Sequence, residues 1–296
     1  MLEINRRNNF QKTPVKAKFL VGLENPKKKT LYFAPTLGYN AYDGFMLGLG
    51  FYNRVFPAKN FEFAFTPMYG FNSGTVAGLG DFKYHINSEN GIFRTTTLGV
   101  NVRSFNEFEN TESDYFRRYA IINPSVRFEL RRQDISPTKQ FITLGYKNIN
   151  DEIANFNPAD FTFTNKENRQ RNILEAKYEL KRSTAFNKSS IELSVLGESY
   201  ERAQASFQSS YIRTTLEATH SIFYAKNKRK SFDIRLFAGG FPFYNRGRAG
   251  GSFPLTLTSQ GYNDWFYDDF YFGRSENSGF LSKQINLGNG GFKVPI

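Results

Sequence analysis

The residue types that most often carry out catalysis are scarce in this sequence. The chain contains two histidines, His85 and His220, and no cysteine, which excludes cysteine nucleophiles, disulfides and thiolate metal sites. It also lacks the H-E-x-x-H spacing of zinc ligands and the G-x-x-x-x-G-K-[ST] loop that binds phosphates. We therefore predict no catalytic residue, no metal site and no cofactor, and we expect both histidines to have structural roles. A barrel hydrolase that uses one of them with a neighbouring acid is the alternative.

Cationic side chains are the most numerous candidates for binding. Lysine and arginine together number 39 against 27 acidic residues, for a formal net charge of +12. Six of them alternate with apolar residues along predicted strands and would line the lumen of a barrel, where they would favour anions: Arg127, Arg131, Lys177, Lys181, Arg213 and Arg235. The basic runs 27–29 and 226–230 are interpreted as solvated turns or as contacts with lipid head groups, including lipopolysaccharide. Nucleic acid is not expected as a partner, because the remaining cations are interleaved with glutamate instead of gathered on one face.

One segment combines acidic and aromatic side chains. Residues 264–272 read DWFYDDFYF and lie within the longest expected connection, 241–278. Long connections commonly carry binding functions, so this segment could fold over a barrel mouth as a lid or plug or form a binding surface. Its carboxylates lack the regular spacing of a calcium-binding loop. The predicted loop or plug residues are Asp264, Trp265, Asp268, Asp269 and Arg274.

The elements that must position these residues are β-strands. Apolar side chains alternate with charged ones, as in Val126, Phe128 and Leu130 against Arg127 and Glu129, which gives each strand one apolar and one polar face. Turn dipeptides such as Asp-Gly and Asn-Gly separate the strands. We predict strands at 15–23, 30–39, 44–53, 60–70, 75–85, 92–104, 116–132, 139–148, 169–182, 188–200, 207–225, 231–240 and 279–288.

The alternation fits both a soluble sandwich, with its apolar face buried, and a membrane barrel, with its apolar face in lipid. Three features favour the barrel: strands much longer than the usual 5–6 residues, aromatic residues near strand ends, and polar faces that carry both charge signs, which suits pairing across a lumen. Long connections at 105–115, 149–168 and 241–278 that alternate with short turns are also typical of outer-membrane barrels. Aromatic residues make up 17% of the chain. The prediction is an all-β, antiparallel, up-and-down transmembrane barrel of about 12–14 strands, with a soluble β-sandwich or barrel as the alternative.

The predicted domain organisation is a polar N-terminal segment, residues 1–14, followed by one barrel domain at 15–296. The final residues, QINLGNGGFKVPI, open a strand with no partner after it. We therefore expect the barrel to lack its final strands and the chain to be a fragment.

Two stretches of the sequence resemble a known family. Residues 36–84, from TLGYNAYDGF to GLGDFKY, and residues 261–274, GYNDWFYDDFYFGR, are similar to the barrel region appended to aminopeptidase-N-like zinc metallopeptidases of Gram-negative bacteria. The resemblance covers about residues 30–296. It implies a bacterial outer-membrane location and a catalytic domain upstream. Because H-E-x-x-H is absent, the family's peptidase activity is assigned to no residue of this chain.

The expected function is accordingly a membrane anchor or translocation scaffold for a metallopeptidase-like protein, with the lipid bilayer as its partner and no catalysis of its own. An outer-membrane channel or uptake pore with a basic lumen is the first alternative. A truncated metallopeptidase or a barrel hydrolase is the second.

Overall fold

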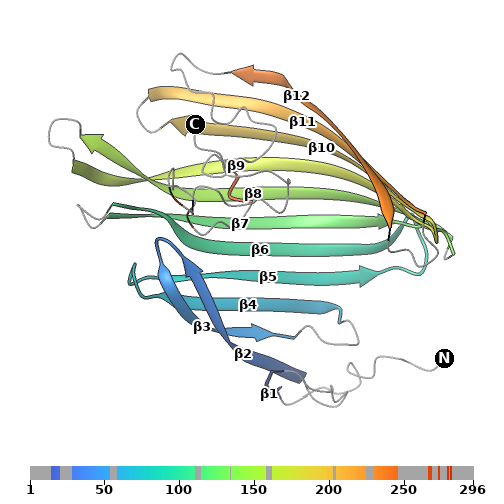
Figure 1. The fold of residues 1–296 in the computed structure, drawn as a ribbon, viewed down its shortest axis with the longest axis horizontal. Helices are drawn as coiled ribbons and strands as arrows, with labels where there is room; N and C mark the ends of the chain where they lie inside the picture. The colour runs from blue at the N-terminus through green and yellow to red at the C-terminus, as the bar shows by residue number, and fades with distance from the viewer. Residues whose placement is uncertain are drawn as a thin grey trace.

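The fold was examined in a computed structural model of the chain. The structure describes residues 15–20, 29–53, 59–110, 115–133, 135–157, 162–202, 205–224, 230–245, 266–268, 273, 279 and 281. Most of these residues form one curved sheet in which each strand lies beside its neighbours in the sequence (Figure 1). The strands are β1 (Val15–Phe19), β2 (Lys29–Asn40), β3 (Gly44–Tyr52), β4 (Phe61–Gly70), β5 (Val76–Asn87), β6 (Phe93–Asn110), β7 (Tyr115–Leu130), β8 (Thr138–Asn157), β9 (Thr162–Ser183), β10 (Asn187–Arg202), β11 (Ala205–Phe223) and β12 (Ser231–Asn245).

The all-β prediction is confirmed, and the order of strands is the one expected for an up-and-down sheet. Strands β2 to β12 pair antiparallel with their neighbours along the whole sheet. Within the described residues, no helix is both long and apolar enough to cross a membrane. The segment 1–14 lies outside the described residues, as does nearly all of the strand predicted at 279–288.

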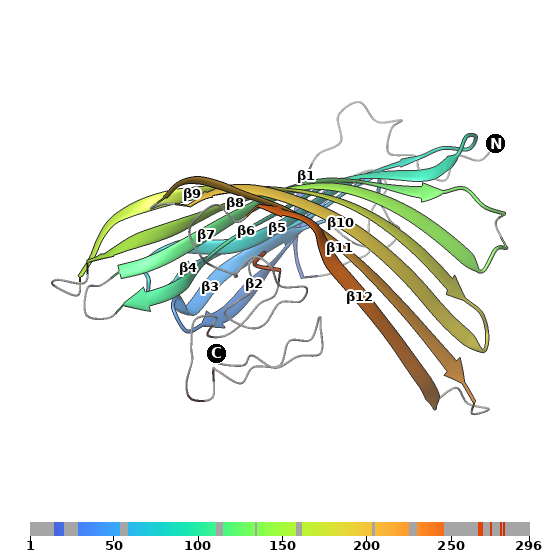
Figure 2. The same cartoon turned by 90° about the horizontal axis from the view of Figure 1, so that it is seen from above.

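The prediction of an antiparallel barrel differs from the structure at the sheet edges. Strand β1 pairs parallel to β2, from Val15↔Lys29 to Phe19↔Phe33. A parallel return is feasible because β1 is only about 17 Å long and the nine residues that follow it can span about 30 Å. Among the described strands, β1 and β12 each pair on one side only, so the sheet is an open arch (Figure 2).

Two connections predicted as long loops are largely strand. Most of 105–115 is paired, because β6 continues to Asn110 and β7 begins at Tyr115. Most of 149–168 is paired too, because β8 reaches Asn157 and β9 begins at Thr162. These stretches are rich in Asn, Glu and Arg, which suggested loops. The hydrogen bonds between strands join backbone groups, however. The β6–β7 and β8–β9 hairpins therefore need no apolar face where they project beyond the rest of the sheet. In the third predicted connection, 241–278, the first residues are also strand, because β12 extends to Asn245.

The two faces of the sheet differ in chemistry. The inner face is the one on which residues 266–268 lie, inside the curve (Figure 2). The outer face is strongly apolar, and its side chains are exposed because nothing described covers them. Large apolar residues at least 40% exposed on this face include Leu37, Phe45, Leu47, Leu49, Leu98, Ile122, Leu144, Leu174, Ile191, Leu193, Leu216 and Leu236.

The predicted hairpin turns at Asp-Gly and Asn-Gly are present. Gly44 and Gly91 have φ of +68° and +113°, values that glycine adopts without steric cost. Asp43, in the β2–β3 turn, is fully buried. Its carboxylate accepts hydrogen bonds from Asn40 Nδ2 (2.7 Å), Ser73 Oγ (2.7 Å), Asn106 N (3.1 Å) and Asn106 Nδ2 (2.6 Å). One carboxylate thus ties the tip of this hairpin to the β4–β5 turn and to β6.

Replacing Asp43 with alanine should weaken this end of the sheet. The donors of Asn40, Ser73 and Asn106 would lose their acceptor in a buried site, and we expect the free energy of unfolding to fall by about 1–3 kcal/mol. Asp81→Ala is the matched control, because Asp81 pairs with the exposed Lys83 (3.0 Å) and should cost less than about 1 kcal/mol. Urea denaturation measures both. Equal effects would show that the buried carboxylate does not fix the hairpin.

Candidate functional site

An apolar cluster lies on the inner face, where most other side chains are polar. Ile121, Ile149, Ile173 and Leu196 come from the neighbouring strands β7, β8, β9 and β10 and are at most 4% exposed. Ile121 and Ile149 are direct cross-strand partners. Because successive residues point to opposite faces, these four share a side with charged residues of the same strands. An apolar patch at such positions needs a cover.

Residues 266–268 supply that cover. Tyr267 is buried and stacks on Tyr119 of β7, with ring centroids 4.3 Å apart. The guanidinium of Arg213 lies over the ring of Phe266 at 4.5 Å from the centroid. The ammonium of Lys147 lies over the same ring at 5.7 Å. Stacking and cation–π contacts of this kind each contribute about 0.5–2 kcal/mol, so the short segment is held from several strands at once.

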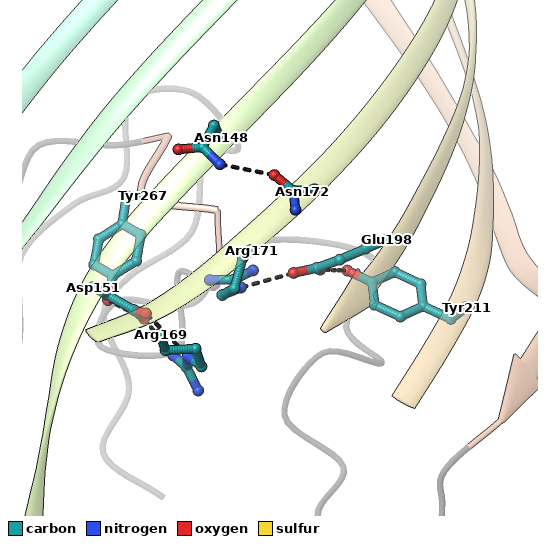
Figure 3. Close-up of polar contacts among 8 residues, drawn as sticks. All are labelled: Asn148, Asp151, Arg169, Arg171, Asn172, Glu198, Tyr211 and Tyr267. Carbon is teal, nitrogen blue, oxygen red and sulfur yellow. Dashed lines mark hydrogen bonds and ion pairs between the residues drawn. The ribbon is translucent and has the colours of Figure 1, made fainter. Parts of the chain in front are cut away.

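Charged side chains of the same strands pair with one another (Figure 3). Arg171 Nε donates to Glu198 Oε1 at 2.7 Å, and neither side chain has exposed surface. The hydroxyl of Tyr211 donates to the other oxygen of Glu198. Taking two charges out of water is costly unless geometry and further hydrogen bonds compensate. The Glu198 carboxylate, on β10, contacts Arg171 of β9 and Tyr211 of β11. It therefore fixes the spacing of these three neighbouring strands.

A second charged group contacts the covering segment directly. Arg169 Nε donates to Asp151 Oδ1 at 2.9 Å, and Tyr267 donates its hydroxyl to Asp151 Oδ2 at 3.3 Å (Figure 3). Burial, together with the carboxylates of Glu107 and Asp151, raises the pKa of Tyr267 well above its ordinary value. The phenol therefore stays protonated and acts as the hydrogen-bond donor.

Asp268 completes the contacts of the covering segment. Its carboxylate forms an ion pair with Lys147, and Arg103 donates to its backbone carbonyl at 3.3 Å. Burial acts to raise the pKa of Asp268, but Lys147, together with Arg103 and Arg213, outweighs burial and lowers it. The carboxylate is therefore ionised at neutral pH and holds the segment to β8.

Four of the six cations predicted to line a lumen are paired with carboxylates on the inner face. Arg127 contacts Glu179 and lies over the ring of Phe141 at 4.2 Å. The other three pairs are Lys181–Glu179 at 3.1 Å, Lys177–Glu192 at 3.1 Å and Arg235–Glu217 at 2.9 Å. Their charges are therefore largely compensated within the sheet.

The other two predicted cations have different surroundings. Arg213 faces Phe266, as described above. Arg131 follows the end of β7 and donates to the backbone carbonyls of Ser88, Gly91 (2.8 Å) and Phe93 (3.5 Å). It thereby satisfies carbonyl groups of the β5–β6 turn.

Of the predicted loop residues, Asp268 is brought to the site, whereas Asp264, Trp265, Asp269 and Arg274 lie outside the described residues. The histidines lie apart from the site. His85, on the inner face, is 3.0 Å from Thr97 Oγ1 and 3.8 Å from Glu62 Oε2. His220, on the outer face, is hydrogen-bonded to Ser189. In the part of the chain that the structure describes, no group of His, Cys, Asp and Glu side chains has the arrangement of a metal site.

The sequence reasoning missed the buried core of this site, namely Arg171, Glu198, Tyr211 and the apolar cluster. A signal was available in two isoleucines. Ile149 lies two residues from Lys147 and from Asp151, and Ile173 lies two residues from Arg171 and from Glu175. Each is therefore an apolar residue in register with charged positions on the inner face. Such an exception to the alternation indicates a covered patch on the inner face.

Comparison with models of protein families, with curated proteins and with solved structures finds no match for this chain.

Replacing Tyr267 with alanine should release the covering segment. The change removes the ring that stacks on Tyr119 and the donor to Asp151, at a cost of about 3–5 kcal/mol. The backbone amides of residues 266–268 should then exchange with deuterium faster, because the segment leaves the inner face, and mass spectrometry measures this exchange. Tyr267→Phe keeps the ring and should cost only about 1 kcal/mol. Exchange of residues 266–268 that is equally fast in both variants would contradict this attachment.

Acidification should weaken the same attachment. The pKa of Asp268 is lowered in the folded chain, so its stabilisation is present above the ordinary aspartate value of about 3.9. It is lost as the pH falls below that value through the lowered pKa. Hydrogen exchange of the amides of residues 266–268, relative to its intrinsic rate at each pH, should become faster over that interval, and Asp268→Asn should remove this step. A step that persists unchanged in the asparagine variant would assign it to another group.

Proposed function

We propose that this chain forms the wall of a transmembrane β-barrel in the bacterial outer membrane and acts there as an anchor or scaffold for an associated metallopeptidase-like domain. The observation that carries the proposal is the orientation of the two faces. The outer face bears exposed large apolar side chains on every strand from β2 to β12, and the inner face bears paired charges. A sheet of this kind is suited to lipid outside and to a polar interior.

The height of the apolar band supports the proposal. On β9 the outer positions from Leu174 to Leu180 are apolar, and the flanking outer positions are Asn172 and Arg182. These two polar positions are ten residues apart in the sequence, which corresponds to about 33 Å along a strand. At the usual tilt of about 40° this gives about 25 Å, the height of the apolar band in outer-membrane barrels.

Aromatic residues border the band at both ends, as in the aromatic girdles of membrane barrels. Near the β2–β3 and β4–β5 turns the exposed aromatic residues are Tyr39, Tyr69 and Phe71, and Tyr146 lies at the corresponding end of β8. At the opposite end of the strands they are Phe61, Tyr84, Phe93 and Phe232. Tyr146 donates its hydroxyl to Asn172 Oδ1 at 2.6 Å, a polar contact suited to the boundary between lipid and water.

The inner face favours an anchor over an anion channel. A channel selective for anions needs cations whose charge is available to the permeating ion. Four of the six predicted lumen cations instead have carboxylate partners. A fifth, Arg213, lies over the ring of Phe266. The link to a metallopeptidase-like domain comes from the resemblance of residues 36–84 and 261–274.

Closure in lipid requires that the edges β1 and β12 pair with further strands, because unpaired backbone groups are costly there.

The orientation of the faces is tested with two neighbouring residues of β11. Leu216 lies on the outer face near the middle of the band, level with Leu193 and Tyr178, and Thr215 lies on the inner face. Leu216→Arg should destabilise the protein folded into lipid vesicles by about 2–4 kcal/mol. Thr215→Arg places the same charge among carboxylates and should cost far less. Urea titration in phosphatidylcholine vesicles measures both.

Equal tolerance of the two arginines would contradict a lipid-facing outer face. So would a chain that is monodisperse in buffer without detergent, because the apolar side chains would then have to be covered by protein.

A further inference from the structure

We propose that the outer face carries a binding site for the phosphate group of an anionic phospholipid, formed by Arg182, Ser189 and His220. This inference rests on the proposed membrane location and adds to it a specific lipid contact. The three residues belong to β9, β10 and β11 and form a row across neighbouring strands.

The pairing of the strands brings the three side chains together. Ser189 is the direct cross-strand partner of Arg182 on one side and of His220 on the other. Directly opposite residues have Cβ atoms about 5 Å apart, so the row spans about 10 Å. Ser189 Oγ lies 2.8 Å from His220 Nδ1, which fixes both side chains relative to each other.

The row lies at the boundary of the apolar band. The next outer residues toward the middle of the sheet are Leu180, Ile191 and Ala218. In the other direction β9 ends at Ser183, and the β9–β10 turn carries the exposed Phe186. A lipid phosphate lies at this level, just outside the acyl chains. A long arginine side chain can extend along the apolar surface and keep its charged group at the head groups.

The charge of Arg182 is available to a ligand. Its side chain is exposed, and no carboxylate among the described residues forms an ion pair with it. Cations of the inner face such as Arg127 and Arg235 differ, because each contacts a glutamate. Guanidinium binds two phosphate oxygens at once through parallel N–H donors.

The serine–histidine pair adds a further donor in either tautomer. If Ser189 donates to Nδ1, the proton of His220 is on Nε2 and is available to a phosphate oxygen. If Nδ1 donates to Ser189, the serine hydroxyl proton is available instead. The row therefore presents a bidentate cation and at least one neutral donor, which matches the oxygens of a phosphodiester.

The position of the row selects phospholipid over lipopolysaccharide. At this end the strands turn within a few residues of the band, whereas at the other end β8 and β9 continue well past Tyr146 and Asn172. In outer-membrane barrels the side with short extensions faces the periplasm. The periplasmic leaflet consists of phospholipid, and lipopolysaccharide occupies the opposite leaflet.

The test uses the whole chain in dodecyl maltoside micelles, titrated with phosphatidylglycerol or phosphatidylcholine, with bound lipid counted by native mass spectrometry. We expect phosphatidylglycerol to bind more tightly. Arg182→Gln should weaken its binding about tenfold or more, the loss expected for one charged hydrogen-bonding group, and Ser189→Ala with His220→Gln should weaken it less. Lys188→Gln is the matched control, because Lys188 is an exposed cation beside Ser189 but on the inner face.

Several results would overturn the site. Two concern selectivity: equal binding of phosphatidylglycerol and phosphatidylcholine, or binding of lipopolysaccharide that is stronger than that of phosphatidylglycerol. The other two are equal effects of Arg182→Gln and Lys188→Gln, and displacement of phosphatidylglycerol by inorganic phosphate at matched concentration. If Arg182→Gln fails to fold, as judged by circular dichroism, the Ser189→Ala, His220→Gln double variant decides. The membrane proposal is tested separately by Leu216→Arg and Thr215→Arg. A chain that distinguishes those two arginines but not the two lipids lies in the membrane without this site.

Discussion

Hydrogen bonding between neighbouring strands is the constraint on which the rest of this structure depends. Strands β2 to β11 each have a partner on both sides, and extended pairing sends successive side chains to opposite faces. That alternation separates the apolar side chains from the charged ones over the whole sheet. The paired charges of the inner face and the bare apolar outer face are therefore consequences of one backbone arrangement.

The sequence predicted most of this framework, because hydrophobic alternation and turn dipeptides are local. Strand β3 and the turn at Asp43–Gly44 were predicted nearly to the residue. The parallel pairing of β1 was not predictable, since nothing in residues 15–19 records the direction of approach. The extensions of β8 and β9 were missed because their polar residues resemble loop composition.

Within the candidate site, the alternation predicted that Arg127, Lys177 and Arg235 lie on polar strand faces, and in the structure all three belong to the inner face. It could not show their pairing. Arg235 and Glu217 are 18 residues apart and meet only because β11 and β12 are in register. The net charge of +12 suggested a basic lumen. Composition only counts the charges, whereas the pairing of the strands determines which of them compensate each other.

The contacts of Asp268 join parts of the chain that are far apart in sequence, with Arg103 lying 165 residues away and Lys147 lying 121 residues away. The strand hairpins close over only a few residues. Because long-range contacts form slowly when much chain must first be ordered, the docking of residues 266–268 should be a late step of assembly. The arch has to be in place before its inner face can receive them.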